Sequence, residues 1–190
     1  MGPALTAAAR ALAAGGLVVY PTDTLFGLGA RASDPDAVER LAAAKRRPAG
    51  MPVSVMVSST GEVEALGELT PAGRRFVRTH LPGPYTVLVT GSPRARRTLA
   101  PPATGPSGIV GLRVPAHPLA RELARRAGPI TATSANLHGA PPCRSVAAAR
   151  RAFGRVVAAY LDGPPRPSGR ASQLVDLTHG EPRRVARRSR

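Results

Sequence analysis

Short apolar runs alternate with alanine-rich segments of helical length along the whole chain. The runs at 17–20 (LVVY), 53–57 (VSVMV) and 86–90 (TVLVT) favour strands, whereas segments such as 4–14 and 34–44 favour helices. Aromatic residues make up only 3% of the 190 residues and Trp is absent, so the core must consist mainly of Ala, Val and Leu. This pattern predicts a single α/β domain in which helices cover a mixed sheet.

The ends of two predicted helices carry capping signals. Ser33 or Asp34 is a candidate N-cap for the helix at 34–44, and Thr70 precedes the helix at 71–80.

The predicted strands are 17–20, 53–57, 86–90, 109–114, 129–133, 156–161 and 172–177, and the predicted helices are 4–14, 34–44, 60–67, 71–80, 117–127 and 145–152.

Three segments lack such patterns. Residues 91–107 and 162–171 are rich in Pro, Gly, Ser and Arg, which predicts surface loops. The basic tail at about 183–190 (RRVARRSR) is predicted to be partly mobile. The predicted domain therefore spans residues 1–190. It contains the two surface loops, and its last part is this basic tail.

The net charge of +16 points to a polyanionic partner such as RNA or a triphosphate. A lone Cys143 excludes an internal disulfide, and no segment reaches the roughly 20 apolar residues that span a bilayer. The first 16 residues lack the basic start of a signal peptide. We therefore expect a cytoplasmic protein with no membrane partner.

Common catalytic signatures are missing from the sequence. GLGARA at 27–32 lacks the third glycine of the dinucleotide fingerprint, and there is no P-loop pattern. The four His residues show no metal-ligand spacing, and Ser134 does not lie in a Gly-x-Ser-x-Gly elbow. No covalent nucleophile and no protein metal site is predicted.

Four polar clusters instead follow or end predicted elements. PTDT at 21–24, KRRP at 45–48 and TSAN at 133–136 are also typical of turns, helix ends and caps, respectively. Arg113 lies within an apolar strand, where a guanidinium needs an anion unless it faces solvent. Ligands of open α/β sheets bind in a crevice at strand ends, so the four clusters are candidates to line one such crevice.

Two residues are rare in this chain. Lys45 is the single Lys among 27 basic residues, and Asn136 is the single Asn. A chain that uses Arg at every other cationic position indicates that a compact ammonium is needed at position 45.

The sequence resembles a known family. PTDTLFGLGA, KRRP followed by MPVSVMV, LPGPYTVLV, GLRVPAHP, ITATSANLHGAP and ASQLVDL match, in order and over nearly the whole chain, the motifs of the YrdC-like threonylcarbamoyl-AMP synthases. The resemblance implies a twisted sheet with a deep basic cavity, in the single-domain form.

The resemblance also implies an activity. The family condenses L-threonine, bicarbonate and ATP into threonylcarbamoyl-AMP and pyrophosphate, and other proteins then transfer the threonylcarbamoyl group to tRNA. Magnesium is expected as the ATP complex, and because the 11 carboxylates are not clustered, the phosphates rather than a dedicated protein site are expected to supply most of its ligands. The implied partners are therefore ATP, threonine, bicarbonate, the downstream transferase machinery and a tRNA or double-stranded RNA.

The resemblance assigns roles to particular residues. Gly27 and Gly29 are implied to let the backbone pass close beneath the threonine. The implied catalytic cations, which also bind ATP, are Lys45 and Arg47; the implied threonine-binding residues are Thr22, Thr24, Arg113 and Ser172; and the further ATP-binding residues are Ser134, Asn136 and, in a less defined register, Arg187.

The chain departs from the family pattern at Met51, Met56 and Gln173, and these departures bear on which substrate is bound.

The sequence leaves two other functions open. One is a non-catalytic module that binds tRNA or double-stranded RNA, whose binding would weaken steeply with salt. The other is a related carbamoyl-adenylate-forming enzyme, although such domains usually sit in long multidomain chains.

Overall fold

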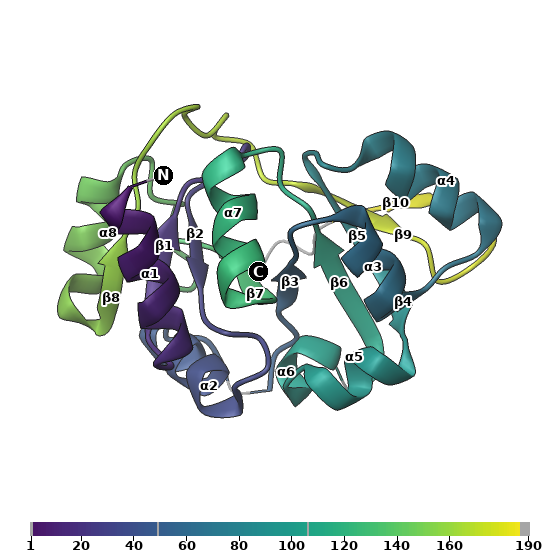
Figure 1. The fold of residues 1–190 in the computed structure, drawn as a ribbon, viewed down its shortest axis with the longest axis horizontal. Helices are drawn as coiled ribbons and strands as arrows, with labels where there is room; N and C mark the ends of the chain where they lie inside the picture. The colour runs from purple at the N-terminus through teal and green to yellow at the C-terminus, as the bar shows by residue number, and fades with distance from the viewer. Residues whose placement is uncertain (1, 49, 106, 187–190) are drawn as a thin grey trace.

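The computed structural model describes residues 2–48, 50–105 and 107–186. The strands are β1 (Leu17–Tyr20), β2 (Gly27–Gly29), β3 (Ser54–Met56), β4 (Gly67–Glu68), β5 (Tyr85–Gly91), β6 (Ile109–Arg113), β7 (Ile130–Ser134), β8 (Val157–Tyr160), β9 (Gln173–Asp176) and β10 (Arg183–Val185). Within the described residues these ten strands form one mixed sheet in the order β10-β9-β5-β6-β3-β7-β2-β1-β8, with β4 beside β5 (Figure 1). The pairs β1–β8, β3–β6 and β5–β9 are parallel.

Helices cover both faces of one half of this sheet and one face of the other. They are α1 (Pro3–Ala13), α2 (Pro35–Ala44), α3 (Thr60–Leu66), α4 (Pro71–His80), α5 (Pro93–Thr98), α6 (Pro101–Thr104), α7 (Pro118–Ala127) and α8 (Val146–Phe153), followed by the 3-10 turn Gly154–Val156. Figure 1 shows α1 and α7 beside β1 and β2, and α3 with α4 at the β5 end.

Strand β1 is buried on both sides. Val18 and Tyr20 pack with α1 and α7, whereas Leu17 and Val19 pack with α2 and α8. Successive side chains of a strand point to opposite faces, so a strand between two helical layers must be apolar at every position. This requirement explains the continuous run LVVY.

The other half of the sheet has one packed face and one open face. Val55, Val87, Val89, Val110 and Leu112 belong to a core cluster that also contains side chains of α3, α4, α5 and α6. The residues that alternate with them line a cavity; they are Ser54, Met56, Thr86, Leu88, Ile109, Gly111 and Arg113. The two-residue period of β3, β5 and β6 therefore places the cavity on the sheet face opposite these helices.

Most predicted elements are confirmed. Each predicted strand and helix has an observed counterpart, with ends that differ by at most two residues. Asp34 is the N-cap of α2 and accepts a hydrogen bond from Ala37 N at 3.0 Å, and Thr70 accepts one from Gly73 N at 3.1 Å. The segment 162–171 contains neither helix nor strand, as predicted.

The prediction for one irregular segment is wrong. The predicted loop at 91–107 contains α5 and α6; α5 begins after Ser92, whose hydroxyl accepts from Ala95 N at 3.2 Å. In the segment 183–190, Arg183–Val185 form β10, which pairs antiparallel with β9, and residues 187–190 lie outside the described part of the chain. Strands β2 and β4 were not predicted either.

Strand β2 explains the glycines at 27 and 29 differently from the expected approach to a ligand. A Cβ at Gly27 would lie 2.7 Å from the Tyr20 ring, and one at Gly29 would lie 2.5 Å from Ile130 Cγ2. Tyr20 spans this strand to donate a hydrogen bond to Thr131 O at 3.1 Å. The glycines therefore make room for the side chains of the two neighbouring strands.

We predict that Gly29→Ala destabilises the fold by about 1–3 kcal/mol, because the added methyl group forces well-packed side chains apart. The matched control is Gly61→Ala, at an exposed position of α3 where the nearest atom is 3.8 Å away; this change should be neutral or stabilise the helix by up to about 1 kcal/mol. Urea denaturation measures both free energies of unfolding. Equal stability of the two variants would contradict the packing role of Gly29.

Candidate active site

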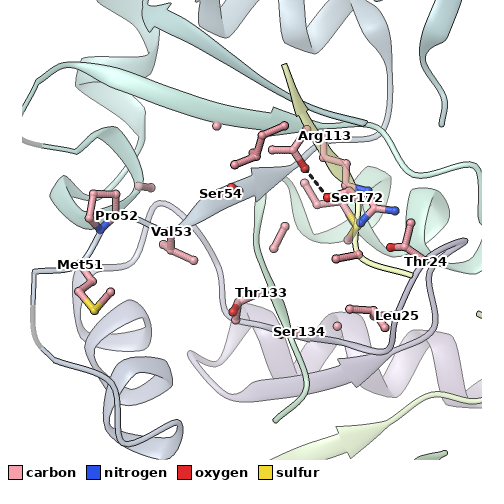
Figure 2. Close-up of a pocket in the computed structure, with 18 of the residues that line it drawn as sticks. Thr24, Leu25, Met51, Pro52, Val53, Ser54, Arg113, Thr133, Ser134 and Ser172 are labelled. Carbon is pink, nitrogen blue, oxygen red and sulfur yellow. Dashed lines mark hydrogen bonds between the residues drawn. The ribbon is translucent and has the colours of Figure 1, made fainter. Parts of the chain in front are cut away.

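A cavity of about 650 Å³ lies on the open face of the sheet. This volume is in the range of small-molecule sites. Eight residues proposed from the sequence line it together: Thr22, Thr24, Lys45, Arg47, Arg113, Ser134, Asn136 and Ser172. Figure 2 shows Thr24, Arg113 and Ser172 on one side and Met51 with Pro52 on the opposite side.

The PTDT segment forms a turn in which Thr22 is used internally. The Thr22 hydroxyl donates to Leu25 O at 2.7 Å and accepts from the backbone N–H groups of Thr24 and Leu25. The Thr22 and Thr24 hydroxyls lie 3.0 Å apart. Because the single proton of Thr22 goes to Leu25, Thr24 is the donor in this pair, and its oxygen keeps acceptor capacity toward the cavity.

Arg113 is only 8% exposed and has the anion that its burial requires. Its Nη2 donates to Asp23 Oδ1 at 2.7 Å, and the same oxygen accepts from Ala116 N at 3.2 Å. The Nε of Arg113 is buried and has no hydrogen-bond partner among the described atoms. Arg113 lines the cavity and carries further N–H groups on its guanidinium, so the pair with Asp23 leaves donors for a ligand. Asp23 was missed in the sequence, although it is the acid of the PTDT motif.

The loop at 162–171 is attached to this end of the cavity. Ser168 N donates to Asp23 O at 3.2 Å, and Gly169 N donates to Thr24 O at 2.8 Å. His117 is fully buried, and burial lowers its pKa, so a neutral ring donates from Nε2 to Pro165 O at 2.9 Å. These bonds position the chain that leads to Ser172.

Ser172 and Thr86 form a buried hydroxyl pair in the cavity wall, with their oxygens 2.8 Å apart. Thr86 was not proposed from the sequence. The sequence feature that could have identified Thr86 is its position in LPGPYTVLV, where a polar side chain follows a turn and starts a strand.

Lys45 ends α2 and reaches across to the loop after β7. It is 4% exposed, and its Nζ donates to Ser134 O at 2.5 Å and to Asn136 O at 2.6 Å. Burial, together with the nearby charge of Arg47, lowers the pKa of Lys45 to about 8. An ammonium carries three donors, so one N–H remains beyond these two bonds.

The loop after β7 is rigidified by its own polar groups. Ser134 Oγ donates to Asn136 Oδ1 at 2.5 Å, and Asn136 Nδ2 donates to Leu137 O and Ala140 O. The amide hydrogens of Asn136 are therefore used within the loop. Arg47, at the rim, donates from Nη2 to Pro52 O at 2.6 Å.

The strand register separates the two basic ends. Met56 pairs with Arg113 on one side and with Ile130 on the other. Ser134, which accepts from Lys45, lies four residues further along β7, which corresponds to about 13 Å along the strand direction. The cavity therefore has an Arg113 end and a Lys45 end.

Some predicted features lie elsewhere. Gln173 is not among the described residues that line the cavity, whereas Met51 and Met56 are. Arg187 lies outside the described residues. Within the described part of the chain, no group of three or more His, Cys, Asp or Glu side chains is placed to hold a metal ion. Nor does any described helix have the length and apolar character needed to cross a membrane.

Comparison with known proteins defines the family. A family model for Sua5, YciO and YrdC proteins, described as "Telomere recombination", matches residues 10–189. The chain belongs to this Sua5/YciO/YrdC family.

Relatives cover nearly the whole chain. A Mycobacterium tuberculosis member of the family is 41% identical over 180 residues, which cover 94% of this chain and 81% of the relative. The "Threonylcarbamoyl-AMP synthase" of Coxiella burnetii is 35% identical over 176 residues, 92% of each chain. The crystal structure of P. abyssi Sua5 complexed with L-threonine matches with a TM-score of 0.85 and 33% identity. That match covers 94% of this chain and 52% of the P. abyssi chain.

From the lowered pKa of Lys45 we predict how the acetylation of this lysine depends on pH in this Sua5/YciO/YrdC protein. Below about pH 8 the amine is protonated, so its acetylation by acetic anhydride should rise with pH through a midpoint near 8. In the urea-unfolded chain the midpoint should return to about 10.4. Peptide mass spectrometry separates Lys45 from the N-terminal amine, the other amine of this one-lysine chain. A midpoint near 10.4 in the folded protein would contradict the burial of Lys45.

Proposed function

We propose that this chain is an L-threonylcarbamoyladenylate synthase, a nucleotidyltransferase that makes threonylcarbamoyl-AMP and pyrophosphate from L-threonine, bicarbonate and ATP. The observation that carries this proposal is a single cavity with two basic ends, lined by hydroxyl groups and, among the described residues, by no carboxylate. The name and the 35% identity of the Coxiella burnetii relative support it, as does the threonine bound to P. abyssi Sua5.

The reaction needs no nucleophile from the protein. The amine of threonine takes up bicarbonate with loss of water to give a carbamate, and a carbamate oxygen attacks the α-phosphorus of ATP as pyrophosphate leaves. Such a step depends on holding two anionic substrates in line and on stabilising the charge at phosphorus. Cations and neutral donors are sufficient for this task.

The Arg113 end suits the threonine. Arg113 lines the cavity and its guanidinium carries N–H groups beyond the one that bonds Asp23, so it is the proposed donor for the carboxylate, while Thr24 and the Ser172–Thr86 pair supply hydroxyl groups. Met56 lies in register beside Arg113 and offers an apolar wall for the methyl group. Thr22 acts in this scheme by shaping the turn that carries Thr24.

The Lys45 end suits the triphosphate. Lys45 and Arg47 supply positive charge, and Ser134 and Asn136 shape the loop on the nucleotide side. Arg187 is proposed as a further nucleotide contact. Magnesium would arrive with ATP, whose phosphates provide oxygen ligands; the described lining residues contain no carboxylate to replace them.

The product defines the expected partners. An acyl adenylate is a reactive mixed anhydride, so a transferase that accepts the threonylcarbamoyl group must use it promptly. We propose that this acceptor machinery modifies tRNA and that the reaction takes place in the cytoplasm, where ATP and tRNA are available. We also propose a direct contact with tRNA or double-stranded RNA, for which the support is the sequence and its net charge.

The primary test is pyrophosphate release with ATP and bicarbonate, with and without each amino acid. Threonine-dependent release supports the synthase. Salt-sensitive RNA binding without any turnover would favour the RNA-binding module instead, because phosphate contacts weaken steeply with ionic strength. Turnover with carbamoyl phosphate in place of threonine would favour the carbamoyl-adenylate enzyme.

We predict that Arg113→Lys raises the KM for threonine about tenfold or more and changes the KM for ATP little. Lys keeps a positive charge beside Asp23 but loses the planar fork, and a hydrogen bond to a charged group contributes about 1.5–3 kcal/mol. Arg75→Lys, on the exposed face of α4, is the matched control. A folded Arg113→Lys enzyme with the wild-type threonine KM would remove Arg113 from the threonine site.

A second prediction concerns the side chain of the substrate. Serine, which lacks the methyl group, should lower the specificity constant by about 1–3 kcal/mol, and valine, which leaves hydroxyl partners unpaired, by at least as much. The measurement is kcat/KM for threonine, serine and valine in the pyrophosphate assay. Equal values for valine and threonine would show that Met51 and Met56 have opened the pocket to another substrate.

A further inference from the structure

The two basic ends of the cavity differ in their charge balance. The guanidinium of Arg113 is paired with the Asp23 carboxylate at 2.7 Å, and both side chains are largely buried. Asp23 is not among the described residues that line the cavity, so the carboxylate that pairs with Arg113 belongs to a residue outside the cavity lining. The positive charge at this end is therefore already compensated within the protein.

Lys45 has no carboxylate partner among its described hydrogen bonds. The Nζ of Lys45 donates to two neutral carbonyl oxygens, and the neighbouring charge that acts on it most strongly is the cation Arg47. Carbonyl dipoles solvate an ammonium but do not cancel its charge. The field at this end therefore favours groups with several negative charges.

The two substrates differ in the same way. Threonine is a zwitterion whose carboxylate is accompanied by an ammonium group, whereas the triphosphate of ATP carries several negative charges and no positive one. A neutralised guanidinium still offers directed N–H donors, because the bond to Asp23 uses only one of the N–H groups of Arg113. Such a group binds a single carboxylate through hydrogen-bond geometry and exerts little long-range pull on phosphate.

We propose that Asp23 is a specificity-determining residue: by neutralising Arg113, it keeps phosphate groups out of the amino-acid end of the cavity. This inference rests on the proposed function, because it assigns threonine to the Arg113 end. Asp23 also positions Arg113, since its Oδ1 is held in turn by Ala116 N.

The test is the effect of inorganic phosphate on threonine use. In the wild type, phosphate should compete with ATP but not with threonine. In Asp23→Asn, which keeps an acceptor oxygen for Arg113 and Ala116 but removes the charge, phosphate should become competitive with threonine. Its inhibition constant against threonine should fall by about tenfold or more, because a full charge at the Arg113 end is then exposed to the anion at short range.

Three variants keep the test specific. Asp23→Glu retains the charge and should restore the wild-type pattern. Asp36→Asn changes the net charge equally at an exposed position of α2 and should leave phosphate inhibition unchanged. Asp23→Ser is a second neutral variant with an oxygen for Ala116 N, and if neither neutral variant folds because a buried guanidinium has lost its anion, the inhibition pattern of the wild type remains the test.

The outcomes separate this inference from the proposed function. A wild type that neither binds nor uses threonine contradicts the proposed function itself. A wild type that turns over threonine but is inhibited by phosphate competitively with it overturns the role of Asp23. The same conclusion follows from a folded, active Asp23→Asn or Asp23→Ser enzyme whose phosphate inhibition is unchanged.

Discussion

A buried cation must be surrounded by oxygen atoms, and this requirement organises the site. Lys45 meets it with two carbonyl groups of the loop after β7, which ties the end of α2 to a segment about 90 residues further along the chain. Arg113 meets it with Asp23, which ties the end of β6 to the turn after β1. The same bonds that satisfy the charges thus bring distant segments together around one cavity.

The alternation of side chains lets one sheet pack against helices on one face and line the cavity on the other. In β5 the buried Val87 and Val89 face the helices while Thr86 and Leu88 face the cavity, and β3 and β6 follow the same rule. A shift of one residue in the register of any of these strands would exchange the two faces. The site is therefore as well defined as the core on which it rests.

Much of this arrangement was predictable from local patterns. Valine runs and capped helices located most elements, and the clusters PTDT, KRRP and TSAN marked strand or helix ends that do meet at the cavity. The identity of the anion beside Arg113 was not predictable, because it depends on strand order, which local patterns do not encode. Strand β2 was missed because glycine has low strand propensity, and the need for glycine there becomes clear only from the Tyr20 and Ile130 side chains that occupy the space beside it. Helix α5 was missed because the Pro, Gly, Ser and Arg content of residues 91–107 is typical of a loop, although Ser92 is an N-cap and Pro93 fits a first helical turn.

The position of β10 at one end of the sheet has a consequence for the interpretation of the chain's charge. A strand at the edge of a sheet exposes unpaired backbone groups to which another chain can add, and a valine-rich sheet is prone to such aggregation. Arg183 and Arg184 are exposed on this strand, and charged side chains at an edge oppose the approach of a second copy. The +16 net charge therefore includes charges that oppose edge-to-edge pairing, so attraction of polyanions is not its sole physical effect.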